Sequence, residues 1–226
     1  MNTVELLTHF FLSTGAAWVL WLLGALSVAS IALCIERALF YRQRKTNIAT
    51  LAQQLDAVLA QNNQEQAIAL LETSGATAAR IACGGLKLSH LGAQSAKRAM
   101  QSAFALERSL LENRLAFLGT LGNNAPFIGL FGTVIGVIQA FEALGHASPG
   151  HASSTVGEVA SQAVMSSIAE ALVATAVGIA VALPAVAAYN YFQRTVASLL
   201  SGSEVLSNLV LAHLSRGRSP CLPEEK

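Results

Sequence analysis

Three long stretches with at most one charged residue each interrupt the polar sequence of this chain. They cover residues 16–35, 115–141 and 159–193, and Glu170 is the single charged residue inside the third. Twenty residues of α-helix rise about 30 Å, which is the thickness of the hydrocarbon core of a bilayer. The pattern therefore predicts three transmembrane helices, the second and third long enough to continue beyond the membrane surface.

The distribution of basic residues predicts the orientation of these helices. Nine of the fourteen Lys and Arg residues lie between Arg42 and Arg114, and four more follow Gln193. Residues 1–15 and 142–158 contain none. Because inner loops carry the excess of Lys and Arg, we expect the N-terminus outside and the C-terminus inside. No basic segment precedes the first stretch, so we expect it to be retained and not cleaved as a signal peptide.

The segments between the spans read as helical. Apolar residues recur at helical spacing through residues 48–71, Ser74 and Gly75 interrupt the pattern, and a further helix from Ser95 is expected to merge with the second span. The tail after Arg216 is expected to be disordered. The fold class is an all-α membrane protein with long helices on the inner side. Its expected segments are an outer N-terminus (1–15), a first span (16–39), an inner helical region (40–114), a second span (115–143), an outer turn (144–158), a third span (159–193) and an inner C-terminal helix with tail (194–226).

Composition supports a membrane protein and excludes several other classes. The chain of 226 residues is 53% apolar and 12% charged, about half the charged share of a soluble protein. A net charge of +1 does not favour nucleic acid as a partner. Cys34, Cys83 and Cys221 are far apart, so we expect neither a disulfide framework nor a zinc site. No HExxH, GxSxG or GxxxxGK motif occurs, so we expect no catalytic residue, bound metal or cofactor.

Glu170 is the main candidate for chemistry. A carboxylate near the centre of a membrane helix costs about 2.5 to 3.5 kcal/mol on insertion scales, so it must lie in a wet or paired environment. Thr133 of the antiparallel second span should lie at a comparable depth, where the two side chains can meet. Thr175 lies about 140° around the helix from Glu170, which directs it to the side of a lumen or to the neighbouring span.

Alternative interpretations of these residues remain open. The Thr133 and Thr175 hydroxyls can bond carbonyls of their own helices, and Glu170 can be paired inside a static bundle. Gly132 and Gly136 form a GxxxG pattern that permits close helix packing. Pro184 leaves a carbonyl of its helix without a donor, which favours a kink or a local water.

Two motifs identify a resemblance to a known family. They are APFIGLFGTV at residues 125–134 and IAEALVATA at residues 168–176, followed by LPAV at 183–186. These runs resemble the ExbB/TolQ/MotA proton-channel family, and its ExbB branch most. The resemblance places Thr133, Glu170 and Thr175 at the polar pore positions of the family.

The resemblance also implies an assembly and a role. It implies a pentamer of three-span subunits in the bacterial inner membrane, with a periplasmic N-terminus and a cytoplasmic C-terminus. The pentamer would surround an ExbD-like single-span partner that carries a membrane Asp. Inward proton flow would then drive a TonB-like protein, which energises outer-membrane transport.

Two other functions remain open. A TolQ-type subunit, which drives TolA for envelope integrity, has nearly the same motifs. A non-conducting membrane scaffold would use the same small-residue faces, and it predicts that Glu170→Gln is tolerated. A MotA-type stator is disfavoured because that branch has four spans, whereas three are predicted here.

Overall fold

The computed structural model describes residues 17–61, 63–146 and 154–216, and the regular elements in these ranges are helices. The predicted all-α class is confirmed. In chain order the elements are α2 (Ala17–Arg44), α3 (Ile48–Ala60), α4 (Gln64–Ser74), α5 (Thr77–Lys87), the short 3₁₀ helix η1 (Ser89–Leu91), α6 (Ala93–Glu112), α7 (Leu115–His146) and α8 (Ser154–Arg216).

Three helices, α2, α7 and α8, contain segments that are long and apolar enough to cross a membrane, as expected. The helix α8 is continuous over 63 residues, so the predicted third span and the C-terminal helix form one element. The expectations for residues 1–15, for the centre of the outer turn and for the tail after Arg216 lie outside the described residues.

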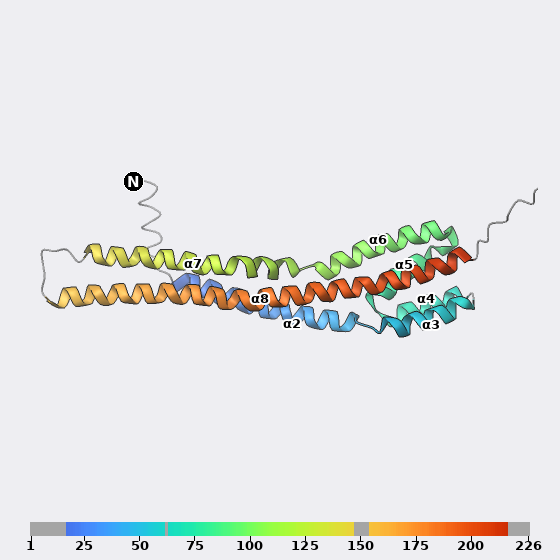
Figure 1. Ribbon diagram of the computed structural model, residues 1–226, viewed down its shortest axis with the longest axis horizontal. Helices are drawn as coiled ribbons and strands as arrows, with labels where there is room; N and C mark the ends of the chain where they lie inside the picture. The colour runs from blue at the N-terminus through green and yellow to red at the C-terminus, as the bar shows by residue number, and fades with distance from the viewer. Residues whose placement is uncertain (1–16, 62, 147–153, 217–226) are drawn as a thin grey trace, which may run out of the picture. The chain divides into compact units, whose positions relative to one another are not determined.

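The chain divides into two compact units. Among the described residues, unit 1 comprises 17–34, 116–146 and 154–190, and it contains the apolar parts of α2, α7 and α8. In this unit α7 and α8 run side by side (Figure 1). Its core is made of small and medium apolar side chains, which are Val19, Leu23, Leu121, Ala125, Ile135, Val181, Ala182 and Ala185.

Unit 2 comprises the described residues 35–61, 63–115 and 191–216, and its core combines leucines and alanines of α3 to α6 with residues of α8. Asn47 and Asn63 cap α3 and α4 by accepting hydrogen bonds from backbone N–H groups. Gly75 ends α4 with φ of 61°, a left-handed conformation that glycine adopts without a steric penalty. The predicted break at residues 74–75 is therefore confirmed.

The predicted merger of the helix from Ser95 with the second span is wrong. The helix α6 ends at Glu112, and α7 begins at Leu115 after a turn in which Arg114 has φ of 66°. A left-handed residue cannot continue an α-helix. The Arg114 guanidinium pairs with Glu36 of α2, which gives the turn a partner outside its own segment.

Candidate functional site

Glycines of α7 let this helix approach α8 at backbone distance. A Cβ added to Gly129 would lie 2.7 Å from the Ala174 carbonyl oxygen. A Cβ on Gly132 would lie 2.8 Å from the Ala174 Cβ, and one on Gly136 would lie 2.6 Å from the Ala171 Cβ. Real Cβ contacts are longer than this, so these positions have no room for a side chain. The three glycines set the register of α7 against α8.

Two prolines lie inside the long helices of unit 1. Pro184 lies within α8 and Pro126 within α7, and each helix continues past its proline. A proline has no N–H, so the carbonyl four residues earlier loses its helical donor. The freed carbonyls are those of Ala180 and Gly122. The sequence drew attention to Pro184 but not to this effect of Pro126.

Glu170 lies at the edge of the contact between α7 and α8. It is half-buried and directly precedes Ala171, which is buried under Gly136. The helical repeat places Glu170 about 100° from Ala171 and about 40° from Ala174, so it stands at the margin of the row of α8 that faces α7. The pairings of Gly136 with Ala171 and of Gly132 with Ala174 bring Thr133 within about one helical turn of Glu170 in depth.

The two threonine hydroxyls differ in their hydrogen bonds. The Thr133 hydroxyl donates to the Leu130 carbonyl at 2.7 Å, so within the chain it bonds its own helix and not Glu170. The Thr175 hydroxyl oxygen is buried and has no hydrogen-bond partner among the described residues. The expectation that each hydroxyl bonds a carbonyl of its own helix therefore holds for Thr133, whose acceptor lies three residues earlier. It does not hold for Thr175.

Glu170 and Thr175 flank the contact with α7 on opposite sides. Thr175 lies against Gly129, since a Cβ on that glycine would be 2.9 Å from the Thr175 Cα. The residues of α8 that touch α7, among them Ala174 and Gly178, lie between Glu170 and Thr175 on the helix surface. The chain thus brings Thr133, Glu170 and Thr175 into one short section of unit 1 without joining them in one hydrogen-bonded cluster.

Unit 2 contains a buried carboxylate that sequence reasoning missed. Glu107 is 5% exposed and pairs with Arg44 at 2.8 Å and with Arg80 at 3.0 Å. It lies seven residues after Met100 and four before Leu111, both buried. A charged residue at an apolar position of a helical repeat was the signal that could have revealed it. The two ion pairs join α2, α5 and α6 and serve the fold.

A second polar cluster in unit 2 contains Cys83. The Lys87 ammonium lies 2.7 Å from the Glu72 carboxylate, and this hydrogen bond raises the pKa of Lys87. Burial raises the pKa of the Cys83 thiol. A raised pKa keeps the thiol protonated at neutral pH, so Cys83 lacks the thiolate that a nucleophile or a metal ligand requires.

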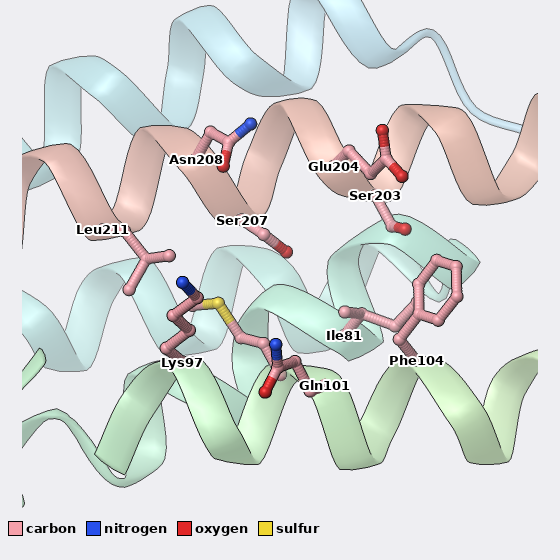
Figure 2. A pocket seen from close by; sticks show the side chains of 10 residues that line it. Ile81, Lys97, Gln101, Phe104, Ser203, Glu204, Ser207, Asn208 and Leu211 are labelled. Carbon is pink, nitrogen blue, oxygen red and sulfur yellow. The ribbon is translucent and has the colours of Figure 1, made fainter. Parts of the chain in front are cut away.

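A cavity of about 360 Å³ lies between α5, α6 and the C-terminal part of α8 (Figure 2). Lys97 and Gln101 come from α6, whereas Ser203, Glu204 and Ser207 come from α8. Its lining mixes one basic, one acidic, several neutral polar and several apolar side chains. This mixture selects no class of ligand, so the section of unit 1 around Glu170 remains the stronger candidate site.

We compared the chain with known protein families, and the match covers the section of unit 1 around Glu170. The profile of the MotA/TolQ/ExbB proton channel family matches residues 76–204, more than half of the chain. The match includes both motifs that carry Thr133, Glu170 and Thr175.

Individual relatives match over shorter segments. The Tol-Pal system protein TolQ of Pseudomonas aeruginosa is 44% identical over 95 residues, which cover 42% of this chain and 37% of that protein. TolQ of Haemophilus influenzae is 47% identical over 93 residues, covering 41% and 37%. The biopolymer transport protein ExbB of Xanthomonas campestris pv. campestris is 34% identical over 118 residues, covering 52% and 43%. The chain thus spans about two fifths of the length of these relatives.

Proposed function

Because the chain belongs to the MotA/TolQ/ExbB proton channel family, we propose that it is a subunit of a motor driven by the proton-motive force. In this proposal the subunit lies in the bacterial inner membrane with its N-terminus in the periplasm and its C-terminus in the cytoplasm. It works with an ExbD-like single-span partner and energises a TonB-like protein for outer-membrane transport.

The observation that carries the proposal is the half-buried position of Glu170 in an otherwise uncharged span. A carboxylate exposed to lipid is costly, whereas one that faces a wet lumen can bind and release protons. The contact row of α8 already packs against α7, and Glu170 stands beside that row. Its free side is therefore available to a lumen formed with other chains.

The assembly we propose is a pentameric ring around the partner helices. A ring encloses the Glu170 carboxylates away from lipid and gives them water and each other as neighbours. The Thr175 hydroxyl is buried within the chain itself and lacks a hydrogen-bond partner among the described residues. Because the hydroxyl is inaccessible while α7 and α8 are packed together, lumen water would bond it only where that contact opens in the assembly.

In the proposed mechanism Glu170 is one station on the proton pathway. Its carboxylate takes a proton from a hydronium ion on the outer side of the lumen, and the neutral acid then gives the proton to a water molecule further inward. One carboxyl group cannot relay a proton across about 30 Å of membrane, so a membrane Asp of the partner provides a second station. Each proton that crosses 100 mV releases about 2.3 kcal/mol, which is the free energy available for work on the TonB-like protein.

A second candidate is a TolQ-type subunit that drives a TolA-like protein for envelope integrity. The similarity to two TolQ proteins, at 44% and 47% identity, supports this alternative. Both roles would use the same residues of unit 1, so they differ in partner and not in proton chemistry.

Complementation with paired controls separates the two roles. The chain and its cognate partner are expressed in one strain that lacks ExbB and in another that lacks TolQ. Each strain is prepared so that the remaining ExbB or TolQ of the host cannot replace the missing protein. Restored siderophore uptake in the first strain supports the TonB-type role, whereas restored detergent resistance in the second supports the TolA-type role. Failure in both strains, at normal membrane abundance, would contradict a motor function of either type.

A further inference from the structure

A second cavity of unit 2, which we name the basic groove, lies between the end of α2, the segment after it, and α8. Its volume is about 710 Å³. Three cationic side chains line it, Arg42 and Lys45 from one side and Arg194 from the other. All three are exposed to solvent, so their charges are available to a ligand.

The charge of the basic groove is not neutralised by the described residues of the chain. None of the described residues that line it is acidic. Arg42, Lys45 and Arg194 form no ion pair within the described ranges, whereas Arg44 and Arg80 both pair with Glu107. A concentration of three positive charges without a counter-charge attracts an anion.

The basic groove also has an aromatic wall, which contacts within the chain hold in place. The Tyr41 hydroxyl donates to the Leu111 carbonyl at 2.7 Å, and the Tyr41 ring lies 5.5 Å from that of Phe192. Tyr191 borders the groove and is 67% exposed. Cations beside exposed aromatic surface suit a ligand that has both an anionic and an apolar part.

The position of the groove along the chain indicates where such a ligand would come from. Arg194 directly follows the uncharged stretch that ends at Gln193, and Arg42 follows the first stretch by seven residues. Both cations therefore stand where an apolar helix meets water. We propose that the basic groove binds an anionic phospholipid, with its phosphate among Arg42, Lys45 and Arg194 and its acyl chains against the apolar surface beside Tyr191.

Lipid binding to the purified oligomer tests this proposal without reference to proton flow. Native mass spectrometry would count the molecules of phosphatidylglycerol or phosphatidylcholine with identical acyl chains that remain bound during titration. Each cation near an anionic surface contributes about 1 kcal/mol, so each neutralised residue should weaken phosphatidylglycerol binding about fivefold. The triple substitution Arg42→Gln, Lys45→Gln and Arg194→Gln should weaken it about a hundredfold.

Two controls test whether binding requires the cations of the basic groove and the acyl chains of the lipid. The double substitution Lys97→Gln and Arg98→Gln removes exposed cations outside the basic groove and should leave binding unchanged. Inorganic phosphate at millimolar concentration should fail to displace the lipid, because it lacks acyl chains.

Three results would overturn the proposal: equal retention of phosphatidylcholine, unchanged phosphatidylglycerol binding by the triple variant, or displacement of the lipid by inorganic phosphate. The last would assign the groove to free phosphate. Arg194→Gln alone, with a fivefold effect, provides the measurement if the triple variant does not assemble. Because the readout is bound lipid, the result is independent of whether the chain drives uptake.

Discussion

Gly129 of α7 and Gly178 of α8 lie in direct backbone contact. A Cβ on Gly178 would be 3.1 Å from the Gly129 Cα and 2.7 Å from the Ala125 carbonyl oxygen. The obstructing atoms belong to the backbone, so no side-chain rotation can relieve the overlap. This contact sets the register that places Thr175 beside Gly129.

We therefore predict that Gly178→Ala destabilises unit 1. Overpacking a close contact costs about 1 to 3 kcal/mol. At Gly24 and Gly145 a Cβ meets nothing within 4 Å, so alanine there should be neutral or slightly stabilising because it favours helix. Thermal unfolding of the purified variants in mild detergent measures the difference. Equal stability of Gly178→Ala and the two control variants would contradict the close contact.

Removal of the Thr175 hydroxyl should have opposite effects on the stability of the subunit and on its activity. Valine keeps the shape of threonine but removes a buried hydroxyl that has no partner among the described residues. Leaving such a group unbonded costs about 1 to 3 kcal/mol, so Thr175→Val should leave the isolated subunit as stable or more stable. In the working assembly the same variant should lose activity, because opening of the contact between α7 and α8 would expose the hydroxyl to lumen water.

Two related variants serve as controls for this prediction. Thr175→Ser keeps the hydroxyl and should retain most uptake activity. Thr133→Val should impair uptake less than Thr175→Val, because the Thr133 hydroxyl already donates to the Leu130 carbonyl. Full activity of Thr175→Val at equal membrane abundance would exclude a role for this hydroxyl in the pathway.

Glu107 supports a prediction about the stability of unit 2. Glu107→Gln leaves Arg44 and Arg80 without a counter-charge, and breaking a buried pair in this way costs about 2 to 4 kcal/mol when one partner stays partly in water. The matched control is Arg108→Gln, which removes an exposed ion pair with Glu112 and should cost under about 0.5 kcal/mol. Denaturant unfolding, monitored by limited proteolysis, would measure the loss in free energy of unfolding for each of the two variants.

The long elements of the fold were predictable because each rests on a local rule. The uncharged stretches that become α7 and α8 meet the length that a bilayer requires, and Gly75 ends α4 as its residue type indicates. The break before α7 was not predictable. It depends on Arg114, a residue without turn preference, whose guanidinium is held by Glu36, 78 positions earlier in the chain.

The sequence proposed the residues of the candidate site but not their contacts. The lone charge in an apolar stretch identified Glu170, and the helical repeat gave its angle to Thr175. Which neighbours each side chain meets depends on the register of α7 against α8. That register follows from where pairs of small residues fit together, and a periodic pattern contains no such information. The bond from Thr133 to Leu130 appeared only in the structure.

The proposed orientation predicts a specific labelling pattern. In a background with the native cysteines replaced by serine, Ser153→Cys lies in the expected outer turn and Gln64→Cys lies on the exposed face of α4. A membrane-impermeant maleimide should label Ser153→Cys in intact cells and should label Gln64→Cys only after permeabilisation. The opposite pattern would reverse the orientation assigned from the Lys and Arg residues.

The replacement of Glu170 tests the centre of the proposed mechanism. Glutamine keeps the size of the side chain and most of its hydrogen bonds but cannot bind or release a proton at working pH. Glu170→Gln should therefore assemble with its partner at normal abundance and abolish proton-driven uptake or, for the TolA-type role, detergent resistance.

The same substitution separates a proton pathway from a scaffold, because the two predict opposite results. A scaffold needs only the shape and polarity of residue 170, which glutamine provides, whereas a motor needs a charge that responds to the transmembrane potential. Glu170→Asp is the informative companion, since it shortens the side chain but keeps the titratable group, and it should retain partial activity. If Glu170→Gln supports full activity while Glu170→Asp does not, the side chain acts through its shape, and proton transfer by Glu170 is excluded.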